Sequence, residues 1–219
     1  APPRLPYNGG MKKLAIIGGG AAGLAAAVSA ARDAAGGMDV VVYEADERVG
    51  RSILATGNGR CNFSNARVDA GVYRNAEFVA AALGVLADAD TSVDPVHAFF
   101  ADLGLVWREE GEGRLYPLAN KASSVLDVLR SAMADFGAVE ACERRAVRLD
   151  VPERPGGRFH IRFADGAVEH ADAVVLATGG RTARELLPAG IPVSATRPVL
   201  GPLRTATDVV KHLNNIRVR

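Results

Sequence analysis

Three glycines near the start of the sequence have the spacing of a phosphate-binding turn. Gly18, Gly20 and Gly23 stand in Gly-x-Gly-x-x-Gly register, between an apolar run and an alanine-rich stretch. The first glycine of such a turn permits a tight bend, the second lets the backbone approach a pyrophosphate, and the third lets the helix pack on the sheet. The N–H groups of a helix beginning at Ala21 and Ala22 would then point at the phosphates. The spacing alone is a weak indication, because a glycine-rich turn can also be purely structural.

An acidic residue follows the glycines at the distance that a ribose contact requires. Glu44 ends a second apolar run 21 residues beyond Gly23, close to the roughly 20 residues that are usual in dinucleotide-binding units. Its charge disfavours a ligand with a ribose 2′-phosphate, such as NADP, because like charges repel. The alternative is an ordinary solvated carboxylate at a strand end.

The segment "RSILATGNGRCNFSN", residues 51–65, is rich in groups that bind polar ligands. It contains two glycines, three asparagines, two arginines and a cysteine, in a pattern typical of neither an amphipathic helix nor a strand. Several of its groups could hydrogen-bond to phosphate, ribityl hydroxyls or flavin carbonyls: Arg51, Gly57, Asn58, Arg60 and Asn62. The alternative is that Asn58-Gly59 is only a hairpin dipeptide.

The cysteines and histidines indicate neither a disulfide scaffold nor a metal site. For Cys61, a redox role beside a cofactor and a packing role in the loop are both open. Cys142 is far away in sequence and no Cys-x-x-Cys pattern occurs, which favours a reducing cytoplasm. No metal site is expected, because four histidines lack ligand-like spacing: His97, His160, His170 and His212.

The length and charge of the chain restrict its partners. The 219 residues suffice for one sizeable core, or for one domain and the start of another. The 26 basic and 25 acidic side chains nearly cancel without long like-charge blocks, so no nucleic-acid or anionic lipid partner is expected. Residues 14–31 are uncharged, but they are mostly glycine and alanine, and the glycine turn explains them better than a membrane span. Residues 1–10 are expected to be a flexible leader.

The elements around the glycine turn form a βαβ unit. A strand is expected at 12–17, a helix from the turn to about Ala35 with Gly36-Gly37 as its cap, and a buried parallel strand at 38–44. Further helices are expected at 76–88 and at 94–104, the latter with Asp94 as N-cap. The clearest amphipathic helix covers 123–136, with one apolar face: Val125, Leu129, Ala132, Met133 and Phe136.

In the C-terminal third of the sequence, apolar residues recur at every second position. Segments 144–151, 157–166 and 167–180 predict a β-meander that ends in an apolar strand at 173–177. After Gly180 the chain is rich in proline and resembles a connector. We therefore expect an α/β, Rossmann-like dinucleotide-binding domain at 11–187, with a parallel sheet, crossover helices and a meander. Residues 188–219 would be a connector.

Four segments resemble a family of bacterial NAD(P)/FAD-dependent oxidoreductases, described as aminoacetone oxidase-like or dehydro-bile-acid reductase-like. They are "IIGGGAAGLAAA" (16–27), "GRSILATGNGRCNFSN" (50–65), "GRLYPLANKASSVLDVLR" (113–130) and "AVVLATGG" (173–180). The second is the most specific, whereas many flavoproteins share the first and last. The segment "RTARELLPAGIPV" departs from the family's usual pattern, and family members are nearly twice as long, so the chain is expected to be a fragment.

The resemblance implies that the Rossmann-like domain at 11–187 is an FAD-binding domain, and that the connector at 188–219 leads towards a second domain that is largely absent. It also implies a place for each candidate residue around FAD. Gly18, Gly20 and Gly23 would lie at the pyrophosphate, Glu44 at the ribose, and the segment 57–62, which includes Cys61, near the flavin. Val147 would contact the adenine through its backbone. Thr178 and Gly179 would return the last strand to the cofactor, although Thr178 could equally be a plain strand end.

The function expected from these features is a cytoplasmic flavin oxidoreductase. It would transfer hydride through the flavin to or from a small organic substrate, with NAD(P)H as a candidate reductant. The alternatives are an NAD-dependent dehydrogenase and a dinucleotide-binding module without turnover. The sequence identifies no catalytic residue, substrate or oligomeric state.

Overall fold

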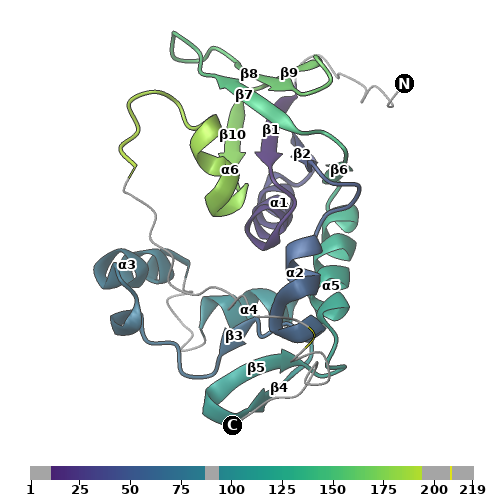
Figure 1. Cartoon of the computed structure of the whole chain (residues 1–219), viewed down its shortest axis with the longest axis vertical. Coiled ribbons are helices and arrows are strands. Elements are labelled where there is room, and N and C mark those ends of the chain that lie inside the picture. Colours follow the sequence, from purple (N-terminus) through teal and green to yellow (C-terminus); the bar gives the residue numbers. More distant parts are fainter. Residues whose placement is uncertain (1–10, 87–93, 194–207, 209–219) are drawn as a thin grey trace. The chain divides into compact units, whose positions relative to one another are not determined.

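The computed structural model describes residues 11–86, 94–193 and 208 (Figure 1). The chain divides into two units, Ala1–Ala189 and Gly190–Arg219, and all the helices and strands named below belong to the first. No helix in the described ranges is long and apolar enough to cross a membrane.

Four parallel strands form the central sheet, in the order β10-β1-β2-β6. They are β1 (Lys12–Ile17), β2 (Met38–Tyr43), β6 (Val139–Ala141) and β10 (Ala173–Leu176). Ile17 pairs with Tyr43 on one side and with Leu176 on the other, so these three strands end at one edge. Strands buried on both faces require continuous apolar runs, which β1, β2 and β10 have. The predicted Rossmann-like α/β fold is confirmed, although the sequence analysis missed β6.

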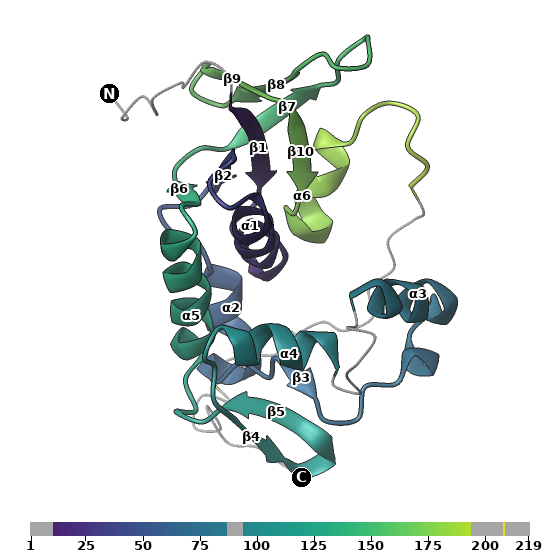
Figure 2. The same ribbon diagram turned by 180° about the vertical axis from the view of Figure 1, so that it is seen from behind.

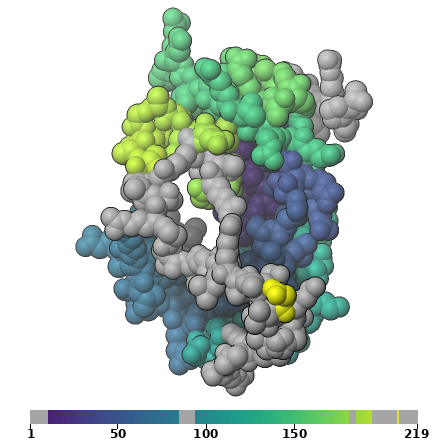
Figure 3. Space-filling view, viewed as in Figure 1, coloured from purple at the N-terminus to yellow at the C-terminus, as the bar shows by residue number. Residues whose placement is uncertain are grey.

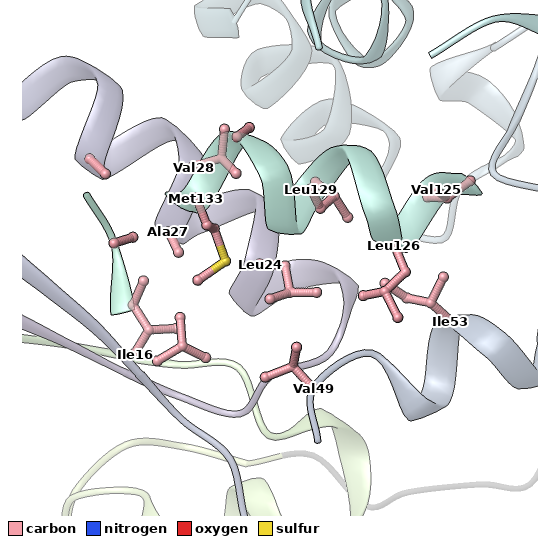
Figure 4. Packing of buried hydrophobic residues seen from close by; sticks show 14 of the residues in the cluster. Ile16, Leu24, Ala27, Val28, Val49, Ile53, Val125, Leu126, Leu129 and Met133 are labelled. Carbon is pink, nitrogen blue, oxygen red and sulfur yellow. The ribbon is translucent and has the colours of Figure 1, made fainter. Parts of the chain in front are cut away.

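Two helices cover one face of this sheet. In α1 (Ala21–Ala34) a stripe of small and apolar side chains is buried, and α5 (Ala122–Asp135) packs on it. Figure 4 shows Leu24 and Val28 of α1 beside Leu129 and Met133 of α5.

Two details of these helices differ from the expectation. The left-handed residue that ends α1 is Ala35, with φ of 46°, rather than Gly36. Phe136 is 38% exposed and does not belong to the buried face of α5, because the helix ends at Asp135 and the chain turns there.

A second, antiparallel sheet was not expected from the sequence. Its order is β3-β5-β4, formed by β3 (Ser64–Asn65), β4 (Trp107–Glu110) and β5 (Arg114–Pro117). These strands are too short and too charged to give a clear alternation. The 3-10 turn η3 (Gly111–Gly113) joins β4 to β5.

Helices lie between β2 and β3 and again between β3 and β4. The segment after β2 forms α2 (Arg51–Ala55) and the 3-10 turn η1 (Thr56–Gly59), where no helix was expected; buried Ile53 anchors α2. Further along come η2 (Ala70–Val72), α3 (Ala76–Leu86) and α4 (Pro95–Asp102). Asp94 caps α4 as predicted, because its carboxylate accepts the N–H groups of Val96 and His97.

The third sheet is the predicted meander, formed by β7 (Ala146–Asp150), β8 (Phe159–Phe163) and β9 (Val168–Ala171). The apolar strand that follows, β10, leaves the meander and pairs with β1 (Figure 2). Ile161 and Phe163 pack with Tyr43 in a second apolar cluster. The chain then forms α6 (Gly179–Leu186), where the sequence suggested a connector after Gly180, and Leu186 joins the same cluster.

Candidate functional site

The glycine turn joins β1 to α1 and uses its three glycines differently. A Cβ atom at Gly18, where φ is 111°, would lie 2.5 Å from the Ala177 carbonyl oxygen, and one at Gly23 would lie 1.9 Å from the Gly18 carbonyl oxygen. Gly23 is therefore required by the packing of the turn itself, and Gly18 by the close approach of the chain that follows β10. A Cβ at Gly20 would meet only Ser52 Oγ, at 3.3 Å. Gly20 thus leaves open space in front of the N-terminus of α1, where the pattern predicts a close approach by a ligand.

Glu44 supports this turn directly. Its Oε2 accepts the Gly19 N–H at 2.7 Å, and its Oε1 accepts the Asp46 N–H at 2.9 Å. The Glu44 carbonyl oxygen also accepts the Arg144 N–H at 2.7 Å. The carboxylate therefore fixes the shape of the glycine turn, a role that the sequence analysis did not foresee. Its predicted contact with a ribose stays a prediction.

A cavity of about 720 Å³ opens at the carboxyl ends of the strands. It is called the polar cavity here because five charged residues line it: Glu44, Asp46, Arg51, Arg144 and Arg145. It is the place where doubly wound sheets bind ligands. Arg51 lies at its wall, paired with Asp46 at 3.0 Å. The structure brings eight of the predicted residues together around this cavity: Gly18, Gly20, Ala21, Ala22, Glu44, Arg51, Thr178 and Gly179.

An apolar cavity of about 880 Å³ adjoins the polar one. It runs along α1 and is lined by α1, α2, α4, α5 and the segment 61–63, including the predicted residues Cys61 and Asn62. Ala21, Ala22 and Ser52 line both cavities, so the two meet at the first turns of α1 and α2. In Figure 3 the purple atoms of the first strand–turn–helix unit lie recessed between the blue and green segments.

The backbone of the segment 57–62 is unusual. Gly57, Asn58, Gly59 and Cys61 all have positive φ, at 55°, 58°, 80° and 57°. The turn is closed by the Cys61 N–H, which donates to the Thr56 carbonyl at 3.1 Å. Helical residues, rather than a strand, precede Asn58-Gly59, so the alternative of a simple β-hairpin is wrong.

Five predicted residues do not line the two cavities: Gly23, Gly57, Asn58, Arg60 and Val147. Val147 lies in β7 and is 49% exposed, while its neighbours Arg145 and Ala146 line the polar cavity. Arg60 points to the second sheet and donates to Glu110 and Asn120. Although desolvation opposes the shift, the hydrogen bonds from Arg60 and Arg108 lower the pKa of Glu110.

Cys61 is 6% exposed and belongs to the main apolar cluster. Burial raises the pKa of its thiol, against a smaller opposing effect of Thr56, so the group is a weak nucleophile at neutral pH. This environment favours the packing role. Among the described residues, no group of three or more His, Cys, Asp or Glu side chains could hold a metal ion.

The sequence analysis missed several residues that line the cavities. Ser52, Ile53 and Thr56 project from α2 and η1 into the apolar cavity. Their spacing of about one helical turn is typical of side chains on one face of a helix, but the glycines that follow made a helix here difficult to recognise. Arg144 and Arg145 reach the polar cavity from the chain between β6 and β7, and no local pattern marks them.

A parallel sheet with a glycine turn between its first strand and the crossover helix, and with cavities at the strand ends, defines a Rossmann-type nucleotide-binding domain. Residues 12–190 match the family model described as HI0933-like protein Rossmann domain. The chain belongs to this family.

Curated relatives cover much of this chain but extend well beyond it. The chain is 38% identical, over 178 residues, to the 3-dehydro-bile acid delta(4,6)-reductase of Clostridium scindens. It is 30% identical, over 174 residues, to the ribosomal RNA dihydrouridine synthase of Escherichia coli. These matches cover 80% and 75% of this chain but only 41% and 38% of the relatives.

Among solved structures, Thermovibrio ammonificans THI4 superimposes with a TM-score of 0.54 at 16% identity. The match covers 79% of this chain and 59% of that one, and it supports the fold alone.

Proposed function

We propose that this chain is the FAD-binding part of an oxidoreductase that transfers hydride between its flavin and a small organic substrate. One observation carries the proposal: a polar cavity at the glycine turn adjoins an apolar cavity at the start of α1. FAD has the same division, with a charged adenosine diphosphate half and a flat, largely apolar ring system.

The residues present fit the charged half of this cofactor. Gly20 leaves room for a pyrophosphate in front of α1, whose 14 residues direct free N–H groups and a positive dipole end at it. Arg51 adds a cation at the same wall, and the Glu44 carboxylate lies at the cavity edge where a ribose would bind. The alternative assignment of Thr178 as a plain strand end receives no support from its position in this wall.

The apolar cavity fits the ring half. Cys61, Asn62 and Phe63 border it beside the alanines at the start of α1, and these side chains would exclude water from a bound ring. When bound, FAD would supply the group that accepts and donates hydride. The chain's own residues bind and orient it.

One consideration supports FAD rather than NAD as the cofactor, and another supports reduction of the substrate as the direction of the reaction. The segment 50–65 resembles that of FAD-dependent oxidoreductases, and the C. scindens relative is named as a reductase. NAD(P)H is the reductant that we propose. Ribosomal RNA is the second candidate substrate, because the E. coli relative is named for it, but the net charge of +1 favours a small molecule.

The absorption spectrum of the purified protein tests this proposal. Bound flavin absorbs visible light, whereas NAD does not. We expect the protein to remain yellow after incubation with FAD and removal of the unbound flavin, and to bleach when NAD(P)H is added in a buffer free of oxygen and other electron acceptors. Saturable binding of NAD without any binding of FAD would overturn the assignment in favour of an NAD-dependent enzyme.

A further inference from the structure

The arginine of the segment 57–62 is held by the second sheet. The Arg60 guanidinium lies 4.2 Å from the centre of the Tyr116 ring and donates to Glu110 Oε1 and Asn120 Oδ1. Its side chain is only 27% exposed. A planar guanidinium can stack and donate along two directions at once, which a lysine ammonium cannot do.

The same sheet supports the segment at two further points. A Cβ at Gly57 would lie 3.6 Å from Tyr116 Cε1, so the ring borders the backbone on which Arg60 stands. The Phe63 N–H donates to the Leu115 carbonyl at 3.1 Å. With its amide nitrogen placed to donate, Asn62 reaches the Leu115 carbonyl, also at 3.1 Å. Strand β5 therefore borders the segment from its beginning to its end.

The segment needs this support because its backbone is strained. Asn58 and Cys61 both have left-handed conformations. Asparagine tolerates this conformation, but for Cys61 it is strained and persists only when surrounding contacts enforce it. Cys61 and Asn62 form part of the wall of the apolar cavity. The shape of that wall consequently depends on contacts made outside the cavity.

We propose that Arg60 is a positioning residue: through it, Glu110, Tyr116 and Asn120 hold the left-handed backbone that places Cys61 and Asn62 in the cavity wall. None of these four side chains lines the polar or the apolar cavity, so their effect on a cofactor is indirect. The backbone part of the proposal stands on the contacts alone. Only its consequence for FAD rests on the proposed function.

Amide hydrogen exchange of the chain without FAD tests the backbone part. The Arg60 and Cys61 N–H groups are bonded to the Gly57 and Thr56 carbonyls, and their exchange reports the shape of the segment. We expect Arg60→Lys and Glu110→Gln each to speed exchange in 57–62 by about tenfold, the effect of losing one charge-assisted hydrogen bond. The exchange rate of the double variant should show no further increase, because both changes break the same contact between Arg60 and Glu110.

Glu109→Gln is the matched control. Glu109 lies on the same strand but pairs only loosely with Arg67, at 3.9 Å, and it should leave the exchange in 57–62 unchanged. Unchanged exchange in Glu110→Gln, or an increase shared equally by α1 and α5, would overturn the proposal. Independent, additive effects of the two substitutions would overturn it as well.

Titration with FAD tests the consequence for the cofactor. We expect Arg60→Lys and Glu110→Gln to raise the Kd for FAD by similar factors. The Kd of the double variant should be no higher than that of either single variant. If Arg60→Lys weakens FAD binding and Glu110→Gln does not, Arg60 contacts the cofactor itself and the positioning role is wrong. If the unaltered chain binds no FAD, the proposed function fails, and hydrogen exchange alone decides the positioning role.

Discussion

Replacing Gly20 by valine separates ligand binding from folding more sharply than any other change in this chain. Gly20 has φ of −79° and ψ of −173°, an extended conformation open to any residue. The added Cβ meets only Ser52 Oγ, at 3.3 Å, and that side chain can rotate away. We therefore expect the free energy of unfolding to change by no more than about 1 kcal/mol, which shifts Tm by about 2–4 °C.

The effect of Gly20→Val on the ligand should be much larger. The valine would fill the space in front of α1 and push a pyrophosphate away from the backbone N–H groups. Losing two charge-assisted hydrogen bonds at about 1.5–3 kcal/mol each raises the Kd by roughly a hundredfold to ten-thousandfold.

Calorimetric titration with FAD and thermal unfolding followed by circular dichroism would measure both quantities. Gly84→Ala in α3 is the control, because its added Cβ has no neighbour within 4 Å and lies outside the turn. An unchanged Kd in Gly20→Val would refute the placement of the pyrophosphate at this turn. A large fall in Tm would refute the assignment of Gly20 to ligand binding rather than packing.

Three further predictions concern stability. Gly23→Ala places a Cβ 1.9 Å from a backbone oxygen and should destabilise the fold by about 3 kcal/mol in urea unfolding; a smaller loss than that of Gly20→Val would contradict the packing role. Leu129→Ala, at a side chain 1% exposed, should cost about 2–5 kcal/mol, and a Tm equal to that of the unaltered chain would show that the core of Figure 4 is wrong. Burial raises the pKa of Tyr43 above its usual 10.0, so the folded chain keeps that proton longer and the free energy of unfolding should fall as pH rises past 10. Tyr43→Phe should flatten this alkaline loss, and superimposable pH profiles would contradict it.

The local pattern predicted those parts of the site that depend on local rules. The βαβ unit, the role of Gly23 and the cap at Asp94 each follow from steric or hydrogen-bonding requirements within a few residues. The steric restriction on Gly18 comes instead from Ala177, which is distant in sequence. The amphipathic face of α5 was predicted for the same reason, up to Val125–Met133. The prediction that Phe136 belongs to this face was wrong. The end of a helix depends on the turn that follows it, and the periodic spacing of apolar residues does not show where that turn begins.

The placement of Arg60 could not be predicted in this way. Its partners Glu110 and Asn120 are 50 and 60 residues away. Glu110 is on a sheet whose strands are too short to recognise, and Asn120 lies in the turn after the strand β5 of that sheet. A guanidinium beside glycines and asparagines suggests an anionic ligand, and only the folded chain shows that a protein carboxylate already neutralises it. Val147 shows the same limit, because the register of β7 decides which of its residues lines the polar cavity.

The sequence by itself determined the class of fold and the position of the glycine turn. Apolar runs, glycine spacing and a strand-end acid act through the backbone nearby and leave few alternatives. The tertiary structure decided that Glu44 braces the turn, that a polar and an apolar cavity meet at Ala21 and Ser52, and that the second sheet clamps the segment 57–62. These features arise from contacts between distant parts of the chain, whose energies depend on the packing of whole elements rather than on any local pattern.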